Sequence, residues 1–315
     1  MRSLLLLLLL GASACAQTTD WDAGPNPSPD LEEAQFRWWV PDGLAKIRGV
    51  LVVIPGSNGD AREAVNDAEW RALVSKQSFA LMGVRLFKAG RGPAYQGDPD
   101  GKTSDTIIRA VAGLAAASGH REAANAPLAF WGHSAGSNTA ERFALRNPRR
   151  MIGVVGIKGT WGPGEATSEK CGIPFLCTIG KADNPDWVET SCRNYEQGKL
   201  NRAVWTLAFH QKEGHEAGGT KPLAVTFLDE VITLRLGDPG SPAAPQVLMK
   251  PDLTSGWLGD PESLDAAPFR DFQGRKRTAT WLPGPQTAAA WQTYLKGIQK
   301  MSDASDRSDL SNKSQ

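Results

Sequence analysis

The chain has no excess of either charge, few cysteines, few histidines and no internal repeat. Its 35 Lys and Arg residues balance 34 Asp and Glu residues, and a net charge of +1 supplies no field that would attract nucleic acid or an anionic membrane. Its run of consecutive leucines, Leu4–Leu10, is too short to span a bilayer. These absences leave a globular protein of one large or two small domains, whose ligand is neutral or held by local groups.

The N-terminus has the layout of a bacterial export signal. Arg2 precedes the leucine run, and small residues follow as far as Cys15. We therefore predict that residues 1–14 are a signal peptide and that the protein is periplasmic, extracellular or lipid-anchored in the envelope. Ala12-Ser13-Ala14 is an A-x-A cleavage site, but the stretch ending in Cys15 also resembles a lipoprotein lipobox. Lipidation of Cys15 and ordinary cleavage, including a cut after Ala16, remain alternatives, and membrane contact is expected only through such an anchor.

The other three cysteines of an exported chain would mature in an oxidising compartment. Cys177 lies inside the apolar run Ile173–Ile179, whereas Cys171 and Cys192 lie in polar sequence on either side of it. We therefore predict a disulfide between Cys171 and Cys192. Their spacing does not match a structural zinc site and no histidine falls between them, so we predict no metal.

A stretch rich in Pro, Asp and Asn predicts a flexible leader over residues 15–35. The middle of the chain, after this leader, alternates between two kinds of segment. Short apolar runs alternate with helical patterns, which predicts an α/β fold over residues 36–235, with a mainly parallel sheet flanked by helices. The expected strands are Phe36–Val40, Gly49–Ile54, Phe79–Leu86, Pro127–Trp131, Met151–Ile157, Ile173–Ile179 and Ala203–Phe209, and the expected helices are Ala61–Lys76, Ser104–Ser118 and Ser137–Arg146.

Beyond Leu236 the sequence becomes rich in Pro, Gly and Trp and loses its periodicity. We interpret residues 236–300 as a C-terminal extension that packs on the core, rather than as another βαβ unit. Its last segment, Thr287–Lys296, is predicted to be an amphipathic helix that Gly297 would end. Residues 301–315 are polar and are predicted to be a disordered tail.

One short motif contains a candidate serine nucleophile. Gly132-His133-Ser134-Ala135-Gly136 matches G-x-S-x-G, in which small flanking residues allow a tight turn from a strand into a helix and expose the serine hydroxyl. An apolar strand enters the motif and a helix leaves it, so Ser134 is the candidate nucleophile. The amide of Ala135, at the positive end of that helix, is one candidate donor to an oxyanion. The second is expected in the glycine-rich turn after Gly49–Ile54, where we assign the Ser57 amide, with Asn58 next.

A serine hydroxyl needs a base, and the base needs an orienting carboxylate. Of the four histidines, we favour His215 over His210 because glycines flank it in a loop that can present the ring above the sheet edge. For the carboxylate we favour Asp183, in the loop after Ile173–Ile179, over Asp186. A serine, a carboxylate and a histidine that act together in this way occur in the chain order Ser, Asp or Glu, His when each follows a strand of a mainly parallel sheet. Ser134, Asp183 and His215 have this order.

Each of these residues also has a purely structural interpretation. Ser134 can be a tight-turn residue, and His215 a solvated loop residue. Asp183 can be the N-cap of a following helix, since Asp-Asn-Pro-Asp is also good turn and cap sequence. The strand, helix and chain order around Ser134 favour the catalytic interpretation.

Aromatic and basic residues lie in loops at the same end of the predicted sheet. Asn58, Trp161 and Trp187 are candidate substrate-binding residues. The two tryptophans could form an aromatic wall for a sugar ring or an aryl ester, and packing under the C-terminal extension is the alternative. Lys158 and Lys181 are candidates for holding an anionic group, although exposed lysines usually have no such role.

On three motifs, IPGSNGD over Ile54–Asp60, GHSAG, and EGHEAG over Glu213–Gly218, residues 36–235 resemble the α/β-hydrolase superfamily. They are similar to secreted esterases such as feruloyl and acetylxylan esterases, polyhydroxybutyrate depolymerases and dienelactone hydrolases. The resemblance implies hydrolysis of a carboxylic ester through an acyl-enzyme, without a cofactor. Pro55 stands where many members have His before Gly, which leaves catalysis intact, whereas the sequence after Leu236 departs from the family and leaves the substrate class open.

The expected partner is a small-molecule or polysaccharide-linked ester, and not nucleic acid. Two other functions remain open from sequence. A peptidase or amidase can use the same triad, because leaving-group preference resides in loop geometry. A non-catalytic envelope protein can keep the fold and bind carbohydrate or a partner through its Trp-rich C-terminal region.

Overall fold

The computed structural model describes residues 18–22, 31–88, 101–159, 168–239 and 248–296. The predicted signal peptide, the lipidation candidate Cys15, the predicted tail 301–315 and the candidate Trp161 lie outside these residues. In the described part, no helix is both long and apolar enough to cross a membrane.

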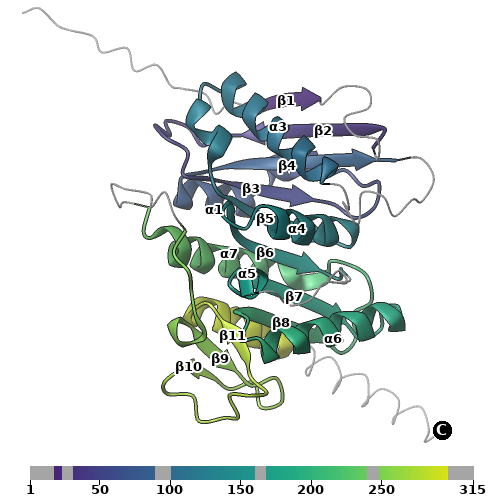
Figure 1. The fold of residues 1–315 in the computed structure, drawn as a ribbon, viewed down its shortest axis with the longest axis vertical. Helices are drawn as coiled ribbons and strands as arrows, with labels where there is room; N and C mark the ends of the chain where they lie inside the picture. The colour runs from purple at the N-terminus through teal and green to yellow at the C-terminus, as the bar shows by residue number, and fades with distance from the viewer. Residues whose placement is uncertain (1–17, 23–30, 89–100, 160–167, 240–247, 297–315) are drawn as a thin grey trace, which may run out of the picture.

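An eight-stranded sheet forms the centre of the molecule, and Figure 1 shows its strands stacked from β1 at one end to β8 at the other. The six strands from β4 to β8 in this order run parallel to one another, while β1 and β2 pair antiparallel at one edge. In spatial order the strands are β1 (Thr18–Asp22), β2 (Glu33–Trp39), β4 (Phe79–Phe87), β3 (Gly49–Ile54), β5 (Leu128–His133), β6 (Met151–Ile157), β7 (Phe175–Gly180) and β8 (Trp205–His210).

Helices cover both faces of the sheet. On one face lie α3 (Lys102–Ala117), α4 (Ala135–Arg146) and α6 (Pro185–Leu200), which share one hydrophobic cluster. On the other lie α1 (Ala68–Gln77), α7 (Lys221–Leu236) and the helical residues 285–296, which share a second cluster. The short helices are η1 (Arg62–Asn66), η2 (Arg121–Asn125), α5 (Ser168–Cys171), η3 (Gly218–Thr220) and η4 (Leu253–Ser255).

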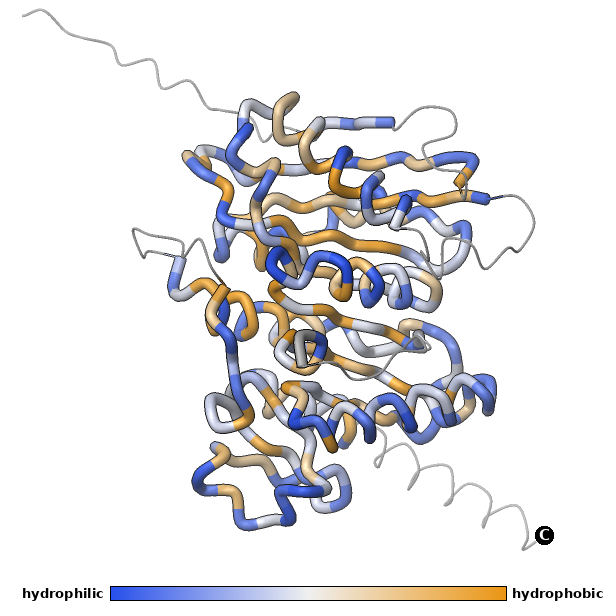
Figure 2. The backbone as a smooth tube through the Cα atoms, viewed as in Figure 1, coloured by the Kyte–Doolittle hydropathy of each residue, from blue (hydrophilic) through white to orange (hydrophobic). Residues whose placement is uncertain are grey.

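The two-sided cover explains the composition of the central strands. Every residue of β3, β6 and β7 is buried, and apart from Thr178 in β7 these strands are continuously apolar because neither of their faces meets water. Figure 2 shows these hydrophobic strands at the centre of the molecule, between the more polar outer helices. The predicted α/β fold with a mainly parallel sheet is confirmed.

The predicted flexible leader is wrong over Thr18–Asp22, which form the edge strand β1, and over residues 33–35, which begin β2. Each residue from Thr18 to Asp22 pairs with one of β2, and the Trp21 ring packs 5.6 Å from that of Phe36. An edge strand is only half covered, so its sequence carries little hydrophobic pattern. The predicted helix over Ala61–Lys76 also divides, because Asp67 ends η1 and caps α1 by accepting hydrogen bonds from two backbone amides.

The C-terminal extension builds a small antiparallel sheet beside β8, as Figure 1 shows. Its strands are β9 (Trp257–Gly259), β10 (Ala266–Pro268) and β11 (Thr280–Leu282), in the order β10-β9-β11. Thr280 Oγ1 accepts a hydrogen bond of 2.7 Å from the Leu207 amide, and Trp291 Nε1 donates one of 2.8 Å to the Leu207 carbonyl. The extension therefore covers the free edge of the sheet and contributes side chains to its core.

The predicted disulfide is wrong, because Cys171, Cys177 and Cys192 are all free thiols. The prediction placed two of them in loops. Cys171 instead ends α5 and is buried, while Cys192 lies in the middle of α6 and packs against the same core. Burial raises the pKa of each thiol, as expected for cysteines used as small apolar residues.

Candidate active site

The turn from β5 into α4 carries Ser134 in a strained conformation. Its backbone has φ 53° and ψ −120°, outside the regions that most residues prefer. A Cβ atom at Gly132 would lie 2.4 Å from the Gly136 carbonyl oxygen, and one at Gly136 would lie 2.4 Å from that of Pro55. The two glycines of the motif are therefore a packing requirement of this turn, which projects the Ser134 hydroxyl out of the sheet.

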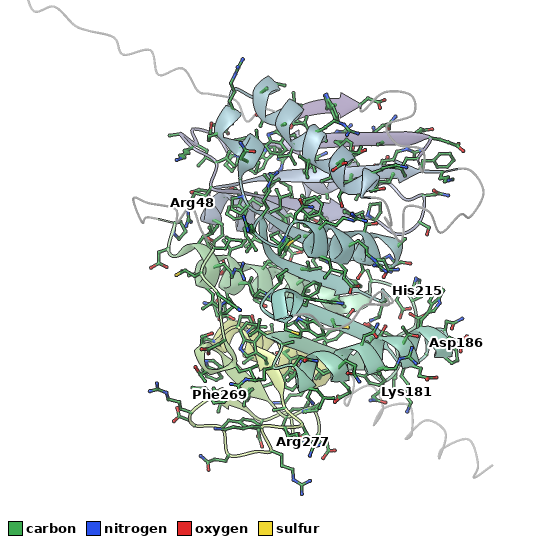
Figure 3. The ribbon with its side chains drawn as sticks, viewed as in Figure 1. Arg48, Lys181, Asp186, His215, Phe269 and Arg277 are labelled. Atoms are coloured by element: carbon green, nitrogen blue, oxygen red, sulfur yellow. The ribbon has the colours of Figure 1, made fainter. Side chains whose placement is uncertain are left out.

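Loops after β5, β7 and β8 bring the three predicted triad residues together. His215 Nε2 lies 2.7 Å from Ser134 Oγ, and His215 Nδ1 lies 2.8 Å from Asp183 Oδ2. Parallel strands end at one edge of a sheet, so residues that follow separate strands meet there. Figure 3 shows His215 at this end of the sheet, with Lys181 and Asp186 nearby.

Burial and hydrogen bonding determine the accessibility and the tautomer of His215. The Asp183 side chain is only 8% exposed, while that of His215 is 35% exposed and accessible to a ligand. Asp183, as a carboxylate, accepts a hydrogen bond from His215 Nδ1, so Nε2 is left to accept one from the Ser134 hydroxyl. This tautomer allows the imidazole to take the serine proton.

The structure distinguishes Asp183 as the partner of His215 from the two alternatives, an N-cap role for Asp183 and Asp186 as the carboxylate. Asn184, and not Asp183, is the N-cap of α6, since its side chain accepts a hydrogen bond of 3.0 Å from the Asp186 amide. Asp186 lies exposed in the first turn of that helix. The second carboxylate oxygen of Asp183 accepts a hydrogen bond of 2.7 Å from the Asn184 amide, which fixes the carboxylate beside His215.

The other two histidines near the site form hydrogen bonds with backbone groups. His210 Nδ1 accepts hydrogen bonds from the backbone amides of Lys212 and Glu213, so its ring braces the loop that leads to His215. His133 Nε2 lies 2.7 Å from the His215 carbonyl oxygen and donates to it. Burial lowers the pKa of His133, so its ring donates as a neutral imidazole. No role was predicted for His133, although its place inside the G-x-S-x-G motif was a signal that its ring faces a neighbouring loop.

The segments that carry the two predicted oxyanion donors lie next to the nucleophile. Ala135 is the first residue of α4, where backbone amides have no partner within the helix. On the other side, a Cβ atom at Gly56 would lie 3.5 Å from Ser134 Cβ, so the turn that carries Ser57 packs against the serine.

The Asn58 side chain has a structural use. Its Nδ2 donates to the Lys88 carbonyl and its Oδ1 accepts from the Lys88 amide, both at 3.0 Å. This pair of bonds ties the turn to the end of β4 and competes with the predicted contact to substrate. Asn58 adopts a left-handed conformation with φ 56°, which asparagine tolerates better than most residues.

Trp187 lies beside the candidate base, in the first turns of α6. Its ring centroid is 4.9 Å from that of His215, and 44% of the residue is exposed. It is therefore placed to contact a group bound at Ser134. Lys158, in contrast, is buried against Glu213 and does not face a ligand, which contradicts the hypothesis that it holds an anionic group.

Among the residues that the structure describes, no three His, Cys, Asp or Glu side chains converge in a way that could hold a metal ion.

A parallel sheet covered on both faces, a nucleophile elbow after β5, and an acid and a histidine after later strands define the α/β-hydrolase fold, and this chain has that fold. No family model and no curated protein matches the chain. Solved structures do. LpqC, a poly(3-hydroxybutyrate) depolymerase from Bordetella parapertussis, is 16% identical, with a TM-score of 0.50 over 67% of this chain and 90% of its own. A ferulic acid esterase is 9% identical, with a TM-score of 0.51 over 69% of this chain and 97% of its own.

Proposed function

We propose that this protein is a serine hydrolase that cleaves carboxylic esters through an acyl-enzyme intermediate. The observation that carries the proposal is the continuous chain of hydrogen bonds from Asp183 through His215 to Ser134, at 2.8 and 2.7 Å. Such a chain turns a weakly nucleophilic hydroxyl into a strong nucleophile by giving its proton a place to go. A serine kept only to make a tight turn has no need of an acid and a base in line with it.

The mechanism follows from the positions of these groups. Ser134 Oγ attacks the ester carbonyl while His215 Nε2 takes its proton, and Asp183 stabilises the resulting imidazolium. The amides of Ser57 and Ala135 stabilise the oxyanion. His215 then protonates the leaving alcohol, and a water molecule activated by the same histidine releases the acid.

The choice of ester over amide rests on two supports. The two similar structures are named as a poly(3-hydroxybutyrate) depolymerase and a ferulic acid esterase, both after ester substrates. Trp187 next to His215 offers an aromatic surface for the alcohol or acyl group of a small-molecule or polysaccharide-linked ester. The predicted export signal would bring the protein to such a substrate outside the cytoplasm.

A fluorophosphonate probe tests the proposal, because it reacts with an activated serine and needs no knowledge of the substrate. We expect the wild-type chain to be labelled, and Ser134→Ala and His215→Ala not to be labelled. Absence of labelling of the folded wild-type protein would refute the hydrolase assignment.

A panel of matched esters and anilides then tests the bond that is cleaved. The panel should include acetyl, butyryl and feruloyl esters. Faster turnover of the anilides than of the esters would overturn the ester assignment while leaving the triad in place.

A further inference from the structure

A second group of ionisable side chains lies next to His215 and is no part of the triad. It joins three parts of the chain: Lys158 directly after β6, Glu213 at the start of the His215 loop, and Tyr294 in the helix 285–296. Lys158 Nζ lies 2.5 Å from Glu213 Oε2, and the Tyr294 hydroxyl donates to the same oxygen at 2.6 Å. The Lys158 side chain is completely buried and that of Glu213 is 12% exposed.

The charges in this group are stabilised by their partners. Burial opposes the charge of Glu213, but the hydrogen bonds from Lys158 and Tyr294 outweigh it and keep the pKa of the carboxyl below its ordinary value. Burial and the adjacent carboxylate raise the pKa of Tyr294, so its hydroxyl stays protonated and donates. A buried ion pair adds little net stability compared with apolar residues of the same size, so stability alone does not account for this arrangement.

Glu213 contacts both loops that carry the acid and the base. Its Oε1 accepts a hydrogen bond of 3.3 Å from the Gly219 amide, which closes the loop around His215. Its backbone carbonyl accepts one of 3.0 Å from the Ala182 amide, directly before Asp183. Gly218 has φ +55°, and a Cβ atom there would lie 2.3 Å from Glu213 Oε1, so the loop has no room for a side chain against the carboxylate.

We propose that Glu213 is a positioning residue for the Asp183–His215 pair, and that Tyr294 makes the C-terminal extension part of the catalytic unit. The proposal rests on the proposed hydrolase function. Lys158, at the end of β6, and Tyr294, in the extension, both bind the Glu213 carboxylate. Glu213 in turn contacts the loops that carry Asp183 and His215, so it fixes their positions relative to the sheet and the extension. Misplacement of a catalytic base by a fraction of an ångström slows proton transfer, because the transfer requires close and aligned groups.

Tyr294→Phe is the sharpest test, because it removes one hydroxyl and keeps the ring that lies 5.2 Å from the ring of His210. Tyr195→Phe is a matched control. The Tyr195 hydroxyl is also buried and also joins the core to the extension, by donating to Thr280 Oγ1 at 2.9 Å, but its bond lies on α6 and β11 and not on either loop.

The measurement is the second-order rate constant of fluorophosphonate labelling, together with kcat and KM for a chromogenic acetate ester, well below the melting temperature of each variant. We expect Tyr294→Phe to lower the labelling rate and kcat about 5-fold with little change in KM. Tyr195→Phe should lower the melting temperature and leave the labelling rate unchanged. Labelling of Tyr294→Phe at the wild-type rate would overturn the proposal.

A double variant, Lys158→Met with Glu213→Leu, tests the carboxylate itself without leaving an unpaired buried charge. We expect a folded protein, by circular dichroism, whose labelling is about 50-fold slower. A folded double variant with wild-type labelling would contradict the positioning role, and if it does not fold, Tyr294→Phe decides. Failure of the wild-type protein to label would refute the hydrolase function, and is therefore distinct from both results.

Discussion

The buried arginines at the amino end of the parallel sheet have different partners from the ionisable groups at its carboxyl end. At the carboxyl end, ionisable groups pair with one another, as Asp183 does with His215 and Lys158 with Glu213. At the amino end, where Figure 3 shows Arg48, the buried arginines donate to backbone carbonyls. Arg48 donates to the carbonyls of Gln77, Leu236 and Gly237.

Helix direction explains the difference. In a βαβ fold the helices run antiparallel to the strands, so α1 and α7 end at the amino end of the sheet, where their last carbonyls have no partner within the helix. A permanently charged guanidinium satisfies them. Arg235, a second buried arginine at this end, donates to the carbonyls of Met151 and Gly172. Burial lowers its pKa to about 10, so it remains charged at neutral pH. The arginines at the amino end thus hold charges that do not titrate near neutral pH, whereas the carboxyl end holds a histidine paired with a carboxylate, a pair that can exchange protons.

Asp183→Asn should have the largest effect and should act on catalysis alone. The amide favours the wrong tautomer of His215, so we expect kcat to fall about 10,000-fold. The melting temperature should change little. Ester hydrolysis by purified protein, with thermal unfolding as the control, measures both, and a loss of less than ten-fold would remove Asp183 from the triad.

Arg48→Met should act on stability alone. It leaves carbonyls at the ends of α1 and α7 unsatisfied, so we expect the free energy of unfolding to fall by about 2–3 kcal/mol. Urea unfolding measures this loss. The rate of fluorophosphonate labelling should stay at the wild-type value, and a slower rate would show that the two ends of the sheet are coupled.

His133→Leu should have a smaller effect on catalysis. It removes the donor to the His215 carbonyl, so the loop loses one constraint and we expect kcat to fall about ten-fold. The check is the kcat of the variant under saturating ester. A fall in stability without a fall in kcat would make His133 a core residue only.

The smallest expected effect is a difference in acid stability. The pKa of Glu213 is lower in the folded chain than its ordinary value of 4.5, so its contribution to stability is present above pH 4.5 and is lost as the pH falls through the folded pKa. The free energy of unfolding of Lys158→Met with Glu213→Leu should therefore fall less steeply below pH 4.5 than that of the wild type. Arg48→Met should keep the wild-type slope, because an arginine does not titrate there, and equal slopes for all three proteins would contradict the assignment.

Strand prediction succeeded where packing is the same on both sides. Gly49–Ile54 and Met151–Ile157 were predicted with the bounds that the structure has, because a strand buried on both faces is a continuous apolar run. Helices were harder. We did not predict α6 or α7, and α7 is buried along much of its length, so its sequence lacks a clear polar face.

The sequence also identified some residues of the site and missed others. The sequence identified Ser134 by its glycine spacing and ranked Asp183 and His215 by their places after strands, and the structure joins all three. It did not identify Glu213 or Tyr294 as partners, because they lie 81 residues apart and meet only through packing of the extension. The same cause defeated the predicted disulfide, since which thiols face each other depends on how α5 and α6 pack.

The sequence by itself determined the layered α/β fold, the elbow at Ser134 and the order of the acid and the base, because these follow from local periodicity and from glycines that only one tight turn requires. Tertiary structure alone decided the edge strand β1, the free cysteines, the brace from Asn58 to Lys88 and the tie from the extension to the His215 loop. These features depend on contacts between segments distant in the chain. Such contacts leave no pattern in either segment alone.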